Sequence, residues 1–319
     1  MNKKNKIIAI EEHYFDPDLT KHFSKGDSLP IELQKQLEDV DELRLKEMDD
    51  AGVDVQVLSH APPATQCLGV DSAATIAKNT NDRLAEIVRT HPDRFAGFAA
   101  LPTADPKAAA KELERTVNDL GFKGAMIHGL TNNVFFDDKR FWPIFERAAS
   151  LDVPIYLHPG PPHPEVVKAY YQDYLDDYPG LLTAAWGYTV ETATAGIRLI
   201  LSGVLEKYPE LKIILGHLGE GLPFLLWRID QALSRPGNKP LSFRDMFSEH
   251  FFVTTSGNFS DPALLCCLQE IGADRILFSV DWPFVPNNPG VDWMESLQLS
   301  NDDKIKILSG NATKLLKLG

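Results

Sequence analysis

Short apolar segments rich in β-branched residues recur along the chain, and each is followed by a longer stretch with apolar residues at helical spacing. This alternation is typical of βα units that form a parallel sheet. We predict eight strands, at residues 7–13, 53–60, 94–102, 123–129, 154–159, 212–217, 251–257 and 276–282. Helices are predicted between them, among others at 72–90, 105–119, 141–151 and 190–207. Eight such units in 319 residues favour an α/β fold of the (β/α)8 TIM-barrel type, with one domain spanning residues 1–319.

An open, doubly wound sheet is the alternative arrangement of the same units. No Gly-rich phosphate-binding motif supports it. Two connections are longer than the usual ~2 to 6 residues: residues 14–37 after strand 1 and residues 160–189 after strand 5. In a barrel such insertions lie at the carboxyl ends of the strands, where active sites form. Each insertion could be a lid, or it could be a subunit contact or mere padding, and both interpretations could hold at once.

Composition and charge limit the classes of partner that the protein is expected to bind. The chain has 32 Lys and Arg against 45 Asp and Glu, a net charge of −13, so its surface repels phosphate backbones and anionic membranes. We therefore expect no nucleic acid and no membrane partner. The three cysteines form no disulfide framework, and no apolar run is as long as a signal peptide core or a membrane span, so we expect a cytoplasmic protein. A small anionic substrate would need a local positive centre.

Histidines gather at the predicted carboxyl ends of strands. Five of the nine do so, namely His13, His60, His128, His158 and His217, and Asp281 ends the last strand. A single histidine at such a position is more often a hydrogen-bonded core or rim residue. Because the carboxyl ends of barrel strands converge on one mouth, five together favour a shared site.

A mixed nitrogen and oxygen ligand set can be assembled from these ends. Strand alternation directs Glu11 and His13 to one face and Glu12 to the other. Together with His158 and Asp281 they would bind one divalent ion, Zn²⁺ or Mn²⁺, with positions left open for water or substrate. Alternatively, Glu11 binds no metal and forms only a structural salt bridge. The fourth strand does not end in a lysine, which disfavours a carbamate-bridged pair of metals.

Glu220 follows His217 by three residues, a spacing that lets the carboxylate orient the imidazole and raise its basicity for proton transfer. Alternatively, Glu220 is simply a charge at a helix N-terminus. His60 precedes a rigid Ala-Pro-Pro segment, and we predict that it contacts the substrate; His128 could contact the substrate or fill the rim.

Five segments together resemble a known family: EEH at 11–13, YLHP at 156–159, the long run at 191–230, VTTSGNF at 253–259 and GADRILFSVDWPF at 272–284. They are similar to the metal-dependent, non-oxidative aromatic acid decarboxylases of the amidohydrolase superfamily, which include the γ-resorcylate and 2,3-dihydroxybenzoate decarboxylases. The resemblance covers most of the chain. It implies a (β/α)8 barrel and reversible release of CO2 from an ortho-hydroxybenzoate, a small aromatic carboxylic acid.

The resemblance also implies roles for individual residues. Glu11, His13, His158 and Asp281 correspond to the metal ligands, and His217 with Glu220 to the family's active-site pair. It implies a homo-oligomer, a dimer or tetramer, in which Arg228 is a candidate to reach the site of a neighbouring subunit. We predict that Asp281 donates the proton to the ring.

Aromatic side chains could line the substrate pocket, and any of them could instead belong to the core: Trp186, Tyr188, Phe259, Trp282 and Phe284. Two other functions remain open. The same ion could activate water for hydrolysis of a lactone or an amide, with Asp281 as base. A catalytically silent metal-binding protein would need a damaged ligand set, and no ligand is missing.

Overall fold

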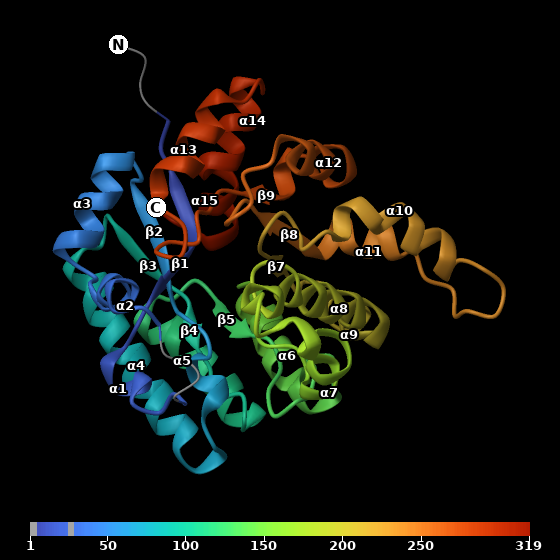
Figure 1. Cartoon of the computed structure of the whole chain (residues 1–319), viewed down its shortest axis with the longest axis horizontal. Helices are drawn as coiled ribbons and strands as arrows, with labels where there is room; N and C mark the ends of the chain where they lie inside the picture. The colour runs from blue at the N-terminus through green and yellow to red at the C-terminus, as the bar shows by residue number, and fades with distance from the viewer. Residues whose placement is uncertain (1–4, 25–28) are drawn as a thin grey trace.

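Parallel strands occupy the middle of the molecule and helices surround them (Figure 1), in a computed structural model that describes residues 5–24 and 29–319. The strands are β1 (Ile8–Tyr14), β2 (Val55–His60), β3 (Phe95–Gly97), β4 (Ala99–Ala100), β5 (Ala125–His128), β6 (Ile155–His158), β7 (Ile213–Leu215), β8 (Phe251–Thr254) and β9 (Ile276–Leu277). They pair in parallel as a three-stranded sheet, β1-β2-β3, and a six-stranded sheet, β4 to β9 in sequence order. The prediction of an α/β fold with parallel strands is confirmed.

The two sheets are linked by hydrogen bonds at both of their edges. Only Phe98 separates β3 from β4; its N–H donates to Leu58 O of β2, and the next N–H donates to Gly124 O, each over 2.9 Å. The predicted strand 94–102 is therefore divided in two. At the other edge, the N–H of Asp281 donates to Glu11 O over 3.2 Å and the N–H of His13 donates to Trp282 O over 2.7 Å. The segment after β9 thus lies against β1.

The helices alternate with the strands, as predicted. The longer ones are α2 (Ile31–Glu38), α3 (Glu42–Ala51), α4 (Val70–Thr90), α5 (Pro106–Leu120), α6 (Trp142–Leu151), α8 (Gly187–Ser202), α10 (Leu222–Leu233), α11 (Phe243–His250), α12 (Asp261–Ile271) and α13 (Asn287–Ser296). The shorter ones are α1 (Pro17–Thr20), α7 (Pro164–Val166), α9 (Val204–Lys207), α14 (Asn301–Ile305) and α15 (Asn311–Leu316). The predicted helix 190–207 is interrupted because Gly203 adopts a left-handed conformation, φ 84°, at the end of α8.

Two apolar layers hold the strands in place. An inner cluster takes buried side chains from both sheets and is closed by α15: Ile8, Ile10, Val57, Ala96, Phe98, Met126, Tyr156, Ile214, Leu277, Ala312, Leu315 and Leu316. The larger outer cluster packs the opposite strand faces against the helices. Side chains of β1 therefore have buried surroundings on both faces, which explains why all seven of its residues are buried.

The two long connections contain short elements. Helices α1 and α2 lie within or at the end of residues 14–37, of which 25–28 fall outside the described residues. Residues 160–189 contain α7 and the short turns η4 (Val167–Tyr171), η5 (Gln172–Tyr174) and η6 (Pro179–Leu182). Among the described residues, no helix combines the length and apolar composition needed to cross a membrane.

Candidate metal centre and catalytic site

Two potential ligands lie on the same face of one buried strand. Glu11 and His13 lie two residues apart on β1 and are completely buried. As predicted from strand alternation, Glu12 points elsewhere: its carboxylate accepts hydrogen bonds from the N–H groups of Val280 and Trp282, over 2.9 and 3.0 Å. A buried carboxylate without a positive partner is costly, so the inward position of Glu11 needs an explanation.

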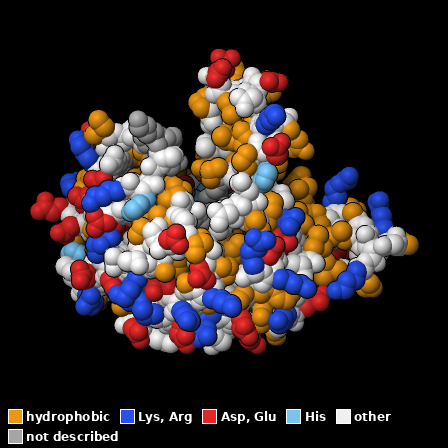
Figure 2. All heavy atoms as spheres, turned by 90° about the horizontal axis from the view of Figure 1, so that it is seen from below, with side chains coloured by type: hydrophobic (Ala, Val, Ile, Leu, Met, Phe, Trp, Pro, Cys, Tyr) orange, Lys and Arg blue, Asp and Glu red, His pale blue; other side chains and the backbone are white. Residues whose placement is uncertain are grey.

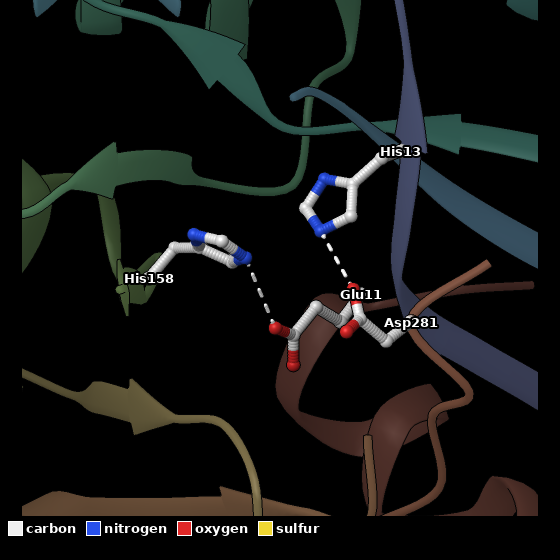
Figure 3. Close-up of side chains that lie close together, drawn as sticks. All are labelled: Glu11, His13, His158 and Asp281. Atoms are coloured by element: carbon white, nitrogen blue, oxygen red, sulfur yellow. Dashed lines mark ion pairs between the residues drawn. The ribbon is translucent and has the colours of Figure 1, made fainter. Parts of the chain in front are cut away.

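The four predicted ligands converge on one point (Figure 3). Glu11, His13, His158 and Asp281 each offer one ligand atom, and these atoms all lie within 4.8 Å of one another. His13 Nε2 is 3.2 Å from Asp281 Oδ1, and His158 Nε2 is 3.3 Å from Glu11 Oε1. Two residues from distant parts of the sequence, His158 and Asp281, thus meet the two ligands of β1 at one end of the strands.

The donor atoms fit a divalent ion. Within the described residues, Glu11 Oε1, His13 Nε2 and Asp281 Oδ1 are buried polar atoms without a hydrogen-bond partner. Metal–ligand bonds of about 2.1 Å separate neighbouring ligand atoms by about 3.0 Å in an octahedron and about 3.4 Å in a tetrahedron. The observed 3.2 and 3.3 Å agree with such a polyhedron.

Hydrogen bonds on their far sides orient the two β1 ligands. The hydroxyl groups of Tyr156 and Thr254 both donate to Glu11 Oε2, the latter over 3.1 Å, which leaves Oε1 for the centre. Ser59 Oγ is 3.3 Å from His13 Nδ1, so Nε2 faces the centre. Burial raises the pKa of the Glu11 carboxyl, which is the cost that a cation would offset.

Asp281 is held by backbone contacts on both of its sides. Its φ is +77°, a conformation that is unfavourable for a residue with a side chain. The carboxylate of Glu12 accepts hydrogen bonds from the N–H groups of residues 280 and 282, on either side of Asp281. Arg44, also completely buried, donates from Nη2 to His13 O and stacks 4.0 Å above the ring of Trp282. Glu12 and Arg44 therefore fasten the Asp281 segment to the strand that carries Glu11 and His13.

His217 lies beside the four ligands and is paired with Glu220. His217 Nδ1 is 2.7 Å from Glu220 Oε1, and His217 Nε2 faces Glu11 Oε1 at 3.9 Å and Asp281 Oδ2 at 3.8 Å. Burial disfavours the imidazolium form, but the carboxylates of Glu220 and Glu11 outweigh burial and raise the pKa of His217 well above its ordinary value. The predicted geometry of the His217–Glu220 pair is present.

Of the other predicted site residues, Phe284 lies beside the four ligands, whereas His60 is bonded to other parts of the protein. The ring centroid of Phe284 is 5.6 Å from that of His13. Both ring nitrogens of His60 have protein partners, the N–H of Asp16 over 3.0 Å and its neighbour's carbonyl, Ala61 O, over 2.8 Å. Burial lowers the pKa of His60 to about 4. The rings of Tyr14, Phe15 and Phe23 also pack against it, with centroids 5.3 to 5.8 Å from that of His60. The substrate contact of His60 stays a prediction.

Two of the aromatic residues considered for the substrate pocket, Trp282 and Trp186, lie in the core and at the surface. Trp282 is 1% exposed and its Nε1 donates to Glu47 Oε2 over 2.7 Å, so it serves the core, one of the two roles left open for it. Trp186 is 54% exposed. Arg228 lies on the exposed face of α10, and its reach into a neighbouring subunit stays a prediction.

Sequence reasoning missed the residues that orient the ligands. Glu12 was predicted only to point away, and no role was assigned to Tyr156 or Ser59. A signal existed for Tyr156, because it precedes His158 by two residues on β6 and must share its face. Glu12 and Ser59 show their function only through contacts with other strands.

Comparisons with known proteins identify relatives that match almost the whole chain. A family model described as amidohydrolase matches residues 13–318. The chain is 43% identical to a γ-resorcylate decarboxylase from Polaromonas sp., over 98% of this chain and 99% of that protein. A crystal structure of a dihydroxybenzoic acid decarboxylase from Polaromonas sp., with bound manganese and 2-nitroresorcinol, is 42% identical, covers 98% of this chain and 97% of that one, and has a TM-score of 0.90. A 2,6-dihydroxybenzoate decarboxylase in complex with 2,6-dihydroxybenzoate is 40% identical, covers 98% and 100% of the two chains, and also has a TM-score of 0.90.

Proposed function

The chain belongs to the amidohydrolase family, and from that membership we propose that it is a carbon–carbon lyase, a metal-dependent, non-oxidative decarboxylase of an ortho-hydroxybenzoate. The observation that carries the proposal is the convergence of Glu11, His13, His158 and Asp281 within 4.8 Å, with the His217–Glu220 pair beside them. Such a site would hold a cation beside groups that can move protons, and a non-oxidative decarboxylation needs no redox cofactor.

The proposed ion is one divalent cation, and Mn²⁺ is preferred over Zn²⁺. Two imidazoles and two carboxylates suit either ion, and no thiolate competes. The manganese in the Polaromonas dihydroxybenzoic acid decarboxylase supports Mn²⁺. Glu11, His13, His158 and Asp281 would hold it.

The proposed substrate is a hydroxybenzoate with the hydroxyl next to the carboxylate, such as 2,6-dihydroxybenzoate. The support is the name and bound ligand of relatives that match almost the whole chain. Phe284 offers an apolar ring surface beside the ligands. A net charge of −13 would repel such an anion, so a local cation is needed for binding.

Each side chain of the site has its own role in the proposed reaction. A divalent ion held by Glu11, His13, His158 and Asp281 would supply positive charge for an anionic substrate and for the electrons that leave its ring. Asp281 delivers a proton to the ring carbon that carries the carboxylate; the bond to the carboxylate then breaks, CO2 leaves, and its electron pair restores the aromatic ring. His217, made more basic by Glu220, holds or deprotonates a phenolic hydroxyl.

Asp281 has to be reprotonated in each turnover. Burial alone would raise its pKa, but the neighbouring imidazoles of His13 and His217 outweigh burial and keep the pKa of Asp281 below its ordinary value. Such a carboxyl group is ionised for most of the cycle and is protonated only between receiving a proton and donating it. His217 Nε2, 3.8 Å from Asp281 Oδ2, is placed to supply it.

We also infer that the strands close into one (β/α)8 barrel and that residues 1–319 form one domain. Counting β3 and β4 as one strand gives eight. The hydrogen bonds between the Asp281 segment and β1, and an inner apolar cluster that includes β1 and β9, support closure. The insertions after strands 1 and 5 are part of the same proposal.

A homo-oligomer, a dimer or tetramer, is proposed from the apolar surface of one arm. Helices α10 and α11 extend from the body, and hydrophobic side chains gather where this arm joins it (Figures 1 and 2). Phe224 is 81% exposed and Trp227 is 64% exposed on α10. Isolated exposed apolar residues are normal, whereas a group of large ones marks contact surfaces. Arg228 lies in the same surface.

A substrate panel tests the proposed function. The chain loaded with Mn²⁺ is incubated with 2,6-dihydroxybenzoate, 2,3-dihydroxybenzoate and salicylate, with lactones and amides alongside, and CO2 release and hydrolysis are measured. We expect CO2 and resorcinol from 2,6-dihydroxybenzoate. His13→Ala should lose this activity, whereas His91→Ala, which changes a histidine paired with Asp41 at the surface, should retain it. Turnover of lactones or amides alone would replace the proposal with a hydrolase.

A further inference from the structure

His128 and His158 meet through their ring nitrogens. They are paired in the register of β5 and β6, are 4% and 5% exposed, and their Nδ1 atoms are 2.9 Å apart. The other nitrogen of His128, Nε2, is 2.9 Å from the backbone carbonyl oxygen of His60. The other nitrogen of His158, Nε2, faces Glu11. The two imidazoles thus form a chain from a backbone carbonyl to the candidate metal centre.

The carbonyl at one end decides where the protons lie. A carbonyl oxygen only accepts, so His128 Nε2 must carry a hydrogen and donate it. In a neutral imidazole the other nitrogen, Nδ1, then has a lone pair and accepts. Its neighbour, His158 Nδ1, must donate, and His158 Nε2 is left with its lone pair toward Glu11 and the centre.

The opposite arrangement is unfavourable. With the proton on Nε2, His158 would present a lone pair at Nδ1 to Pro159 O, an acceptor 2.8 Å away. His128 could then donate to His158 only by taking a second proton or by turning a lone pair toward His60 O. Because Pro159 O also accepts from His158 Nδ1, it reinforces the first arrangement, and His128 adds a second acceptor for the same N–H.

The ends of β5 and β6 are packed so closely that the two rings keep their spacing. Gly129 has φ +55°, and a Cβ added to it would lie 2.8 Å from the Cα of Gly160. The backbones that follow His128 and His158 therefore touch without intervening side chains. Larger residues at either position would push the two strand ends apart.

We propose that His128 is a positioning residue that fixes the tautomer and ring orientation of His158, and so sets the affinity of the centre for its divalent ion. The proposal rests on the proposed function in one respect, that His158 binds the metal. It gives His60 a part through its backbone: the carbonyl of residue 60 is the anchor that makes the chain directional.

Metal affinity tests this directly. Free Mn²⁺ is measured by electron paramagnetic resonance while metal-free chain is titrated with Mn²⁺, for the parent, His128→Leu and His128→Asn. The leucine removes one of the two acceptors of His158 Nδ1 and leaves Pro159 O. Loss of a supporting partner typically weakens metal binding about 10- to 100-fold, and because one acceptor remains we expect the lower end, about tenfold. The asparagine oxygen can replace the acceptor, and we expect it to recover binding to within about fivefold of the parent.

His250→Leu is the matched control. His250 is also buried, 5% exposed, and donates from Nδ1 to a backbone carbonyl, Leu211 O, over 2.9 Å. It should lose a similar amount of thermal stability and keep the Mn²⁺ affinity of the parent. His128→Leu binding Mn²⁺ as tightly as His250→Leu, or His128→Asn binding as weakly as His128→Leu, would overturn the proposal.

The outcome is separable from that of the proposed function. A parent chain that binds Mn²⁺ but releases no CO2 from any hydroxybenzoate would overturn the decarboxylase and leave the role of His128 supported by its affinity data. A parent chain that binds no Mn²⁺ would overturn both.

Discussion

Replacing Glu220 with Gln asks how strongly this carboxylate controls His217. The substitution keeps the shape and an oxygen that can accept from His217 Nδ1, 2.7 Å away, but it removes the negative charge. The Glu220 side chain is completely buried and the His217 side chain is 24% exposed, so the interaction is only partly screened by water. The variant therefore isolates the charge from the geometry.

The magnitude follows from the hydrogen bond. A hydrogen bond to a charged acceptor contributes about 1.5 to 3 kcal/mol and a neutral one about 0.5 to 1.5 kcal/mol, so removing the charge costs the imidazolium about 1 to 2 kcal/mol. The partial exposure of His217 favours the lower end of this range. Because about 1.4 kcal/mol corresponds to one pH unit, a transition governed by His217 should move by about one pH unit.

His217 acts as a base in its neutral form, so the direction of the pH shift depends on its protonated form. Glu220→Gln destabilises the protonated form, so the pKa of His217 falls and its neutral form persists to lower pH. The acidic limb of the profile of kcat/KM against pH for 2,6-dihydroxybenzoate should move to lower pH. The plateau rate should fall about threefold to tenfold, because a less basic imidazole is a weaker proton acceptor.

The assay is the pH profile at saturating Mn²⁺ for the parent, Glu220→Gln and Glu270→Gln. Glu270 is a partly buried carboxylate that pairs with Arg244, 2.9 Å away, and its replacement should leave the profile unchanged. Superimposable profiles of the parent and Glu220→Gln would refute the reasoning that this carboxylate sets the basicity of His217.

Three further results are expected. Asp281→Asn keeps an oxygen ligand but has no proton to give, so kcat should fall at least about 100-fold while titration still shows bound Mn²⁺; near-normal turnover would remove Asp281 as the proton donor. Asp16 caps α1 and pairs with Arg83, whose hydrogen bonds outweigh burial and lower the pKa of Asp16. Its stabilisation is thus present above the ordinary pKa of 3.8 and lost as pH falls through the lower folded-state pKa. Asp16→Asn should lower the free energy of unfolding by about 2 kcal/mol at pH 7, and a urea titration below pH 4 should show a smaller difference from the parent. Chelation should abolish decarboxylation and lower Tm, because Glu11 and Asp281 are left buried near each other; added Mn²⁺ should restore both, and an unchanged Tm would argue against a buried ion.

Several residues around the site have an unfavourable backbone conformation that surrounding contacts must hold. Among non-glycine residues, His217, Leu218, Glu220 and Asp281 all have positive φ, between 51° and 77°. Each such residue costs on the order of 1 to 3 kcal/mol, and it persists only where surrounding contacts hold it. For Asp281 those contacts are visible in the carboxylate of Glu12.

Several features could be predicted from local pattern alone. Eight apolar segments with intervening helical spacing indicated parallel strands, because burial on both faces gives strands a nearly continuous apolar pattern. The period of two along a strand placed Glu11 and His13 on one face and Glu12 on the other. Parallel strands align their carboxyl ends, so His158 and Asp281 could be expected near them. The helix predicted at 105–119 matches α5, because Asp105 caps its start. The break at Gly203 was not predicted.

The tertiary structure alone decided which groups hold the ligands in place. Glu12 and Val280 are 268 residues apart, and Tyr156 reaches Glu11 across 145 residues. His128 acquires its role only because the carbonyl oxygen of His60, 68 residues away, accepts a hydrogen bond from its ring. Local sequence determines the direction of a side chain because backbone geometry repeats along a strand. It does not determine a side chain's partner, because hydrogen bonds between strands depend on register and on the positions of single atoms.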